Sequence, residues 1–239
     1  MAIHPIFQIH AELNGYEPKI WRLFQVANNT TVARLGYILM TLFEMKASHL
    51  FCFEMLKDDL NALSAGRLKK GRSITPKDII RYDMPSDEPF DRKRDIRVAT
   101  QYTLKHAMHA PESRLFFRYD YGDDWFITVT LKDIIQDKGL PGNELPRVLD
   151  GAGFGIVEDC GGVYGLKELR DAFKKKKGEV YDNFREWLGV DNLDLESFDL
   201  DDMNFRLKKI PRIFMQSYEQ ELYPTKQSID LLERKYLKK

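Results

Sequence analysis

Alternating hydrophobic and polar residues predict a β-hairpin at the start of the chain. Every second residue from Phe7 to Leu13 is apolar, and a second apolar run covers Ile20–Val26. A period of two is typical of strands that bury one face. Asn14-Gly15 and Pro18 lie between the two runs and favour a turn. We therefore expect the two strands to pair as a hairpin.

The pattern then changes to a helical period and back again. Apolar residues recur every three or four positions in Val32–Met45, behind Thr30 or Thr31 as the N-cap, which predicts a helix packed on the sheet. His49–Leu56 is again typical of a strand. Residues 58–97 are polar and contain several glycines and prolines, which predicts loops and short helices.

A second hairpin is the clearest local pattern. Apolar residues alternate in Leu115–Tyr121 and again in Phe126–Leu131, on either side of Gly122. The turn between them is acidic and is followed at once by a tryptophan. Residues 139–165 then hold eight of the fifteen glycines, which predicts a loop whose backbone needs positive φ or a close approach to another segment.

Helical patterns dominate the remainder of the chain. They cover residues 166–176, 181–188 and 204–210, and two more follow at 212–223 and 228–239. Together the elements predict an α+β protein: a mostly antiparallel sheet of hairpins with helices packed against it, plus a helical C-terminal tail. We expect one α+β domain over residues 1–210 and a helical C-terminal extension over residues 211–239.

The charge balance excludes a wholly basic nucleic-acid-binding protein. The chain of 239 residues has 37 Lys and Arg against 37 Asp and Glu, so its formal net charge is zero. This zero is a cancellation, because basic clusters at 67–72, 92–97 and 170–177 offset acidic ones at 120–124 and 191–202. If folding joined the three basic clusters, they would form a nucleic-acid-binding face.

The sequence predicts a cytoplasmic protein with no membrane partner. Its first residues lack the basic and apolar regions of a secretory signal, and no apolar run approaches the roughly 18 residues that span a bilayer. Its two cysteines, Cys52 and Cys160, form neither a disulfide framework nor a zinc pattern. We interpret Cys52 as a core residue and Cys160 as a small loop residue.

Four motifs occur in a fixed order along the chain: IWR at Ile20–Arg22, the pair His49-Leu50, YDYGDDW at Tyr119–Trp125 and EDCGGVYG at Glu158–Gly165. With the segments around them, over residues 6–208, the chain resembles the plasmid pRiA4b ORF-3-like family. The resemblance implies an α+β fold and an association with plasmids, transposon resolvases and other mobile elements, but no demonstrated activity. Members commonly carry a histidine-type residue shortly after the tryptophan, where this chain has apolar residues.

The acidic turn is a candidate site for a divalent cation. The candidate metal ligands are Asp120, Asp123 and Asp124. Together with the later Glu158 and Asp159, they would bind the cation and position a phosphate for hydrolysis. The structural alternative is that the aspartates stabilise the turn and the tryptophan packs in the core. The tandem glycines Gly161 and Gly162 precede a predicted helix, and two interpretations are open for them. Their backbone N–H groups bind an anion, or the glycines form a tight structural turn. The expected site groove contains His49, Tyr119, Asp120, Asp123, Asp124, Trp125, Glu158, Asp159, Gly161 and Gly162.

Three functions remain open from the sequence. A binding or accessory module associated with plasmid or transposon DNA is favoured over an enzyme, because no complete catalytic motif is present. The alternative is a metal-dependent hydrolase or nuclease that uses the carboxylate cluster, with His49 as the base. The third is a structural protein-interaction module whose tail, residues 212–239, docks a protein partner or a second copy of the chain as a homodimer.

Overall fold

An eight-stranded sheet forms the centre of the protein, in the strand order β5-β4-β3-β6-β7-β1-β2-β8. The computed structural model describes residues 4–57, 75–85, 95–137 and 139–233. Neighbouring strands pair antiparallel except β4 and β5, which are parallel. The strands are β1 (Ile6–Leu13), β2 (Trp21–Ala27), β3 (Phe51–Leu56), β4 (Ile79–Asp83), β5 (Asp95–Val98), β6 (Arg114–Tyr119), β7 (Trp125–Ile135) and β8 (Arg147–Ala152).

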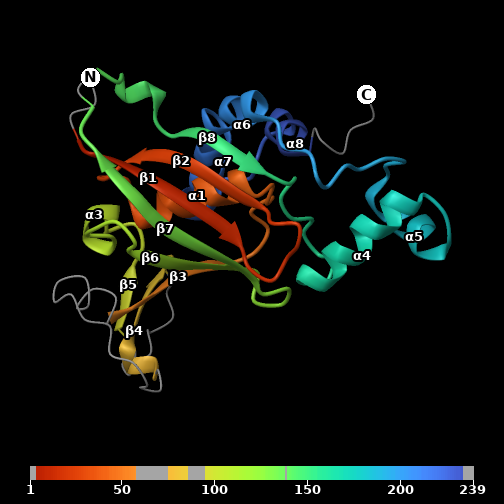
Figure 1. Ribbon diagram of the computed structural model, residues 1–239, viewed down its shortest axis with the longest axis horizontal. Helices are drawn as coiled ribbons and strands as arrows, with labels where there is room; N and C mark the ends of the chain where they lie inside the picture. The colour runs from red at the N-terminus through yellow and green to blue at the C-terminus, as the bar shows by residue number, and fades with distance from the viewer. Residues whose placement is uncertain (1–3, 58–74, 86–94, 138, 234–239) are drawn as a thin grey trace.

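The helices fall into two groups around this sheet (Figure 1). One group gathers on a single face of the sheet, while α4 and α5 extend away from it. The first group is α1 (Val32–Leu42), α6 (Leu200–Leu207), α7 (Ile210–Gln220) and α8 (Lys226–Glu233), and the second is α4 (Gly162–Lys175) and α5 (Glu179–Leu188). A short helix α3 (Leu104–Ala107) and 3-10 turns at Pro76–Asp78 and Gly142–Glu144 complete the described elements. The α+β fold predicted from the sequence is confirmed.

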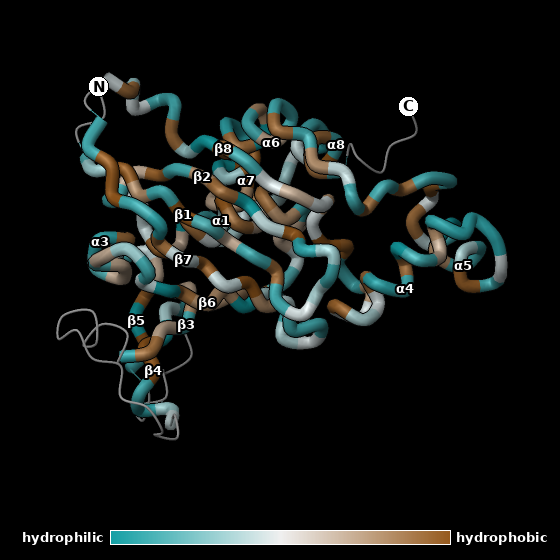
Figure 2. Tube along the Cα trace, viewed as in Figure 1, coloured by the Kyte–Doolittle hydropathy of each residue, from teal (hydrophilic) through white to brown (hydrophobic). Residues whose placement is uncertain are grey.

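Helix α1 is the centre of the core. Ten of its eleven residues are buried, and the Thr31 side chain caps it by accepting a hydrogen bond from the Arg34 N–H at 3.0 Å. Gly36 allows the helix to approach β3 closely, because a Cβ at this position would lie 2.5 Å from the Phe51 ring. Figure 2 shows hydrophobic and hydrophilic residues alternating along strands such as β1 and β7, as expected for a sheet that buries one face.

Arg22, the arginine of the IWR motif, ties the glycine-rich loop to the end of α1. The side chain is fully buried, and burial lowers the pKa of its guanidinium to about 9, which leaves it charged at neutral pH. The guanidinium donates hydrogen bonds of 2.6–2.9 Å to backbone carbonyls of both segments. The acceptors are the carbonyl oxygens of Leu42, Ala152, Gly153 and Phe154.

The structure corrects two parts of the sequence interpretation. Residues 58–97 were expected to form loops and short helices, but β4 and β5 lie within this range and extend the sheet beyond β3. The glycine-rich loop 139–165 likewise contains β8, at the opposite edge of the sheet. Strands of four to six residues carry little periodicity of their own, and pairing with β3 or β2 decides their conformation.

The C-terminal helix α7 packs in the same core as α1. Ile210 and Phe214 are almost completely buried. The ring of Tyr218 stacks on that of Tyr37 with centroids 5.8 Å apart, and the Tyr37 hydroxyl donates a 3.0 Å hydrogen bond to Glu219. Residues beyond position 210 therefore contribute to the core and lie close to the segment that joins α1 to β3. Among the described residues, no helix is long and apolar enough to cross a lipid bilayer.

Candidate functional site

His49 lies in the segment between α1 and β3, where two tyrosines hold its backbone. Its N–H donates to the hydroxyl oxygen of Tyr119 at 3.3 Å, and the preceding Ser48 N–H donates to the same oxygen at 3.1 Å. The hydroxyl of Tyr218, from α7, donates to the His49 carbonyl oxygen. The imidazole meets the Tyr119 ring edge-on at a centroid distance of 5.8 Å. Elements far apart in the sequence thus fix the position of this histidine.

The hairpin turn between β6 and β7 brings Asp120 to the imidazole. Asp120 adopts a left-handed φ of 56°, which aspartate tolerates better than most residues, and its Oδ1 accepts a 2.9 Å hydrogen bond from Gly122 N–H. Its own N–H donates to the Leu50 carbonyl at 3.0 Å, so the turn is tied to the start of β3. The second carboxylate oxygen, Oδ2, lies 3.5 Å from His49 Nε2.

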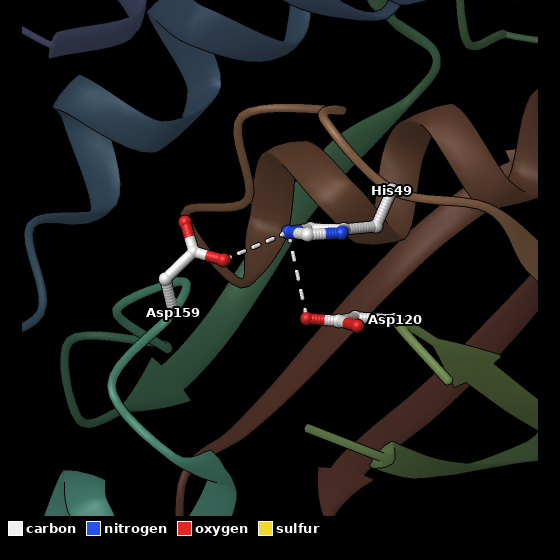
Figure 3. A group of neighbouring side chains, drawn as sticks. All are labelled: His49, Asp120 and Asp159. Carbon is white, nitrogen blue, oxygen red and sulfur yellow. Dashed lines mark hydrogen bonds and ion pairs between the residues drawn. The ribbon is translucent and has the colours of Figure 1, made fainter. Parts of the chain in front are cut away.

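The glycine-rich loop adds a second carboxylate, that of Asp159. Its Oδ1 lies 3.1 Å from His49 Nε2, so the same ring nitrogen faces two acidic side chains (Figure 3). Asp120 is buried, whereas the Asp159 side chain is 64% exposed, which opens one side of the cluster to solvent. Ligand atoms of His49, Asp120 and Asp159 all lie within 4.8 Å of one another, close enough for one cation to contact all three.

The neighbouring Glu158 has a different role, because its buried carboxylate already accepts three hydrogen bonds. The donors are the Lys46 N–H at 2.7 Å and the hydroxyls of Ser48 and Tyr119. Burial, and after it the charge of Glu158, raises the pKa of Tyr119, so this hydroxyl keeps its proton and remains a donor. Glu158 therefore fastens the glycine-rich loop to the segment that carries His49.

The side chains of the other two aspartates of the turn, Asp123 and Asp124, are not part of the His49 cluster and have different neighbours. Asp124 forms an ion pair with Arg118, with its Oδ1 2.6 Å from Nη2. Asp123 is half-buried, and its Oδ2 is enclosed without a hydrogen-bond partner within the described part of the chain. Trp125 is completely buried at the start of β7. Of the three aspartates expected as metal ligands, the structure brings Asp120 to the His49 cluster.

The tandem glycines are required by backbone geometry. Gly161 and Gly162 have φ of 90° and 67°, and a Cβ on Gly162 would lie 2.6 Å from the Asp123 carbonyl oxygen. The turn before α4 therefore packs directly against the acidic hairpin, which only a residue without a side chain allows. The glycines bring the hairpin and the glycine-rich loop together.

The structure describes only part of the three basic clusters. Residues 67–72 and 92–94 lie outside the described residues. In the cluster 170–177, Arg170 contacts Asp171 at 2.9 Å, and Lys174 contacts Glu196 at 2.5 Å. Because these two cations have acidic neighbours, part of the charge that made this cluster a candidate for phosphate binding is neutralised locally.

Sequence reasoning missed Ser48 and Tyr218 among the residues around the site. Ser48 directly precedes the candidate histidine, so its proximity was a usable signal. Tyr218 lies 169 positions after His49, and neither motif nor periodicity relates the two residues. The imidazole of the cluster is that of His49, which the sequence offered as a candidate.

A mostly antiparallel sheet whose loops assemble one imidazole and two carboxylates defines an α+β protein with a candidate metal centre. The chain belongs to the plasmid pRiA4b ORF-3-like protein family, which matches residues 5–204. Tyr218 thus lies beyond the part of the chain that the family covers.

One solved structure is similar to this chain over most of both proteins. It is the crystal structure of a protein of unknown function, MM3350, from Methanosarcina mazei Go1. The sequences are 23% identical, the match covers 83% of this chain and 97% of that one, and the TM-score is 0.65. At this identity the similarity shows the fold alone. No curated protein matches the chain.

Proposed function

We propose that this protein is a binding module for a divalent metal ion, held by His49, Asp120 and Asp159. The observation that supports this function is the convergence of one ring nitrogen and two carboxylates, from three separate segments, within 4.8 Å. The hairpin, the glycine-rich loop and the segment before β3 each contribute one ligand. Two carboxylates match the charge of a divalent cation.

The donor set favours a transition metal such as Zn²⁺ or Co²⁺ over Mg²⁺ or Ca²⁺. Imidazole is a preferred ligand of the first group, whereas Mg²⁺ and Ca²⁺ are bound by oxygen ligands, of which Ca²⁺ takes six to eight. Three protein ligands also leave coordination positions open for water or another ligand.

Calorimetric titration of the full chain with Zn²⁺, Co²⁺ and Mg²⁺ tests this function. We expect one Zn²⁺ or Co²⁺ per chain, weaker binding of Mg²⁺, and a loss of affinity of about 100-fold or more in His49→Ala and Asp159→Asn, because each removes a ligand. His109→Ala and Asp124→Asn are matched controls, since His109 is exposed and Asp124 is paired with Arg118. Equal affinities of His49→Ala and His109→Ala for Zn²⁺ would contradict the proposal.

A metal-dependent hydrolase or nuclease is the second candidate, supported by the open coordination positions and by the exposed side of the cluster at Asp159. In this function His49 is a metal ligand instead of the base, because its Nε2 faces both carboxylates. Hydrolysis of bis(p-nitrophenyl) phosphate with Mn²⁺ or Zn²⁺ tests the activity. It should disappear in His49→Ala and persist in His109→Ala, and a wild-type rate equal to that of the metal alone would exclude it for this substrate.

An accessory role beside plasmid or transposon DNA is a further part of the proposal, and its support is the family description. Fluorescence anisotropy of labelled duplex DNA at two salt concentrations tests it, because phosphate contacts make affinity fall with salt. Absence of salt-dependent binding would argue against it.

We also propose a cytoplasmic location, consistent with the unlinked Cys52 and Cys160.

A further inference from the structure

Both backbone polar groups of His49 are held by tyrosine hydroxyls from different elements. Tyr119, at the end of β6, accepts the His49 N–H, and Tyr218, on α7, donates to the His49 carbonyl. The orientation of the proposed metal ligand thus depends on a helix that follows it by more than 160 positions.

The ring of Tyr218 is itself fixed by packing, which gives its hydroxyl a defined position. It stacks on Tyr37 at an interplanar angle of 20°, and it meets Phe51 edge-on at a centroid distance of 5.2 Å. Its hydroxyl also lies 3.7 Å from the sulfur of Met40. Since these contacts come from α1 and β3, the hydroxyl can hold the His49 carbonyl without ordering a mobile side chain.

From this arrangement we infer that Tyr218 is a positioning residue that sets the metal affinity of the His49 site. The inference rests on the proposed function and extends it to α7, beyond the residues that the family covers. Outer groups that orient a metal ligand commonly change affinity by about 10- to 100-fold when they are removed. One hydrogen bond to the backbone of His49 belongs at the lower end of this range, so α7 tunes the site through a single hydroxyl.

A structural role for the same residue predicts something different. If Tyr218 only docks α7, then any loss of contact between α7 and α1 should affect the site equally. Tyr37→Phe provides the matched control, because it removes the hydroxyl that bonds Glu219 of α7 and leaves the bond from Tyr218 to His49 in place. Tyr218→Phe keeps the stacked ring and removes only the hydroxyl.

Co²⁺ titrations of the full-length wild type, Tyr218→Phe and Tyr37→Phe, followed by calorimetry and visible absorption, test the inference. Circular dichroism melts define an assay temperature at which all three are folded. We expect Tyr218→Phe to raise the Co²⁺ dissociation constant about tenfold and to alter the absorption band of the bound ion. Tyr37→Phe should stay within about twofold of the wild type, because the ligand geometry is preserved.

Two results would overturn the inference alone: equal affinities of the wild type and Tyr218→Phe, or equal losses in both variants. Either would leave Co²⁺ binding by the wild type, and with it the proposed function, intact. Wild-type protein that binds Co²⁺ no better than His49→Ala would overturn both. The outcomes therefore separate a failure of the positioning role from a failure of the metal site.

Discussion

Replacing Glu158 by alanine removes the acceptor for three hydrogen bonds at the junction of the glycine-rich loop and the segment before β3. Of the donors, the Tyr119 hydroxyl is completely buried, whereas the exposed Ser48 can turn toward water. A buried donor left without a partner costs about 1–3 kcal/mol, and the Lys46 N–H adds a second, partly buried one. We expect Glu158→Ala to lower the free energy of unfolding by about 2–4 kcal/mol. Glu158→Gln keeps the shape and one acceptor oxygen, so about 1–2 kcal/mol is expected.

Urea unfolding of the full chain at neutral pH, followed by tryptophan fluorescence, measures this loss. Asp159→Asn is the matched control, because the adjacent acid has an exposed side chain that contacts His49, and asparagine also tolerates its left-handed φ of 62°. Its free energy of unfolding should stay within about 0.5 kcal/mol of the wild type. Equal losses in Glu158→Ala and Asp159→Asn, or none in either, would refute the assignment of Glu158 to structure.

Three further predictions follow from the same contacts. Gly162→Ala should lower the free energy of unfolding by about 2–4 kcal/mol, because its Cβ meets the Asp123 carbonyl. Gly189→Ala has a similar positive φ but meets open space, so it should cost only the left-handed strain, about 1–2 kcal/mol, in parallel urea titrations. Arg22 donates five hydrogen bonds to backbone carbonyls, including that of Trp21, and a lysine can donate at most three, so we expect Arg22→Lys to lower the free energy of unfolding by about 3 kcal/mol or more; an unchanged unfolding midpoint would contradict this. Burial raises the pKa of Cys160 to about 12, so alkylation at pH 8 should be roughly a thousandfold slower in the native protein than in urea, and equal rates would show that burial does not protect the thiol.

Local periodicity was enough to predict most of the long strands and helices. The two hairpins and α1 were predicted because alternation and a helical repeat extend over six or more residues. The strands β4, β5 and β8, at the two ends of the sheet, were missed, because short strands depend on pairing partners that are distant in sequence. The sequence pattern predicted one helix at 204–210 and the next at 212–223, on either side of Pro211. In the structure α7 begins at Ile210, and this proline lies in its first turn, where no N–H is needed.

The candidate site was predicted as a set of residues but not as an arrangement. His49, Asp120 and Asp159 were all candidates, since each lies in one of the motifs that carry the family resemblance. Their grouping depends on β3 pairing with β6, which carries the hairpin turn toward the start of β3. The separate roles of Glu158 and Asp159 follow from which way each side chain points, and sequence neighbours carry no information on that.

The most direct test of the metal site is anomalous diffraction from crystals of the full chain soaked with Zn²⁺ or Mn²⁺. We expect one strong peak at the cluster, about 2.0–2.2 Å from Nε2 of His49 and from one carboxylate oxygen each of Asp120 and Asp159. The same soak of Asp159→Asn crystals should weaken or abolish the peak. An empty cluster in wild-type crystals at millimolar metal, with His49 still between the two carboxylates, would contradict the account.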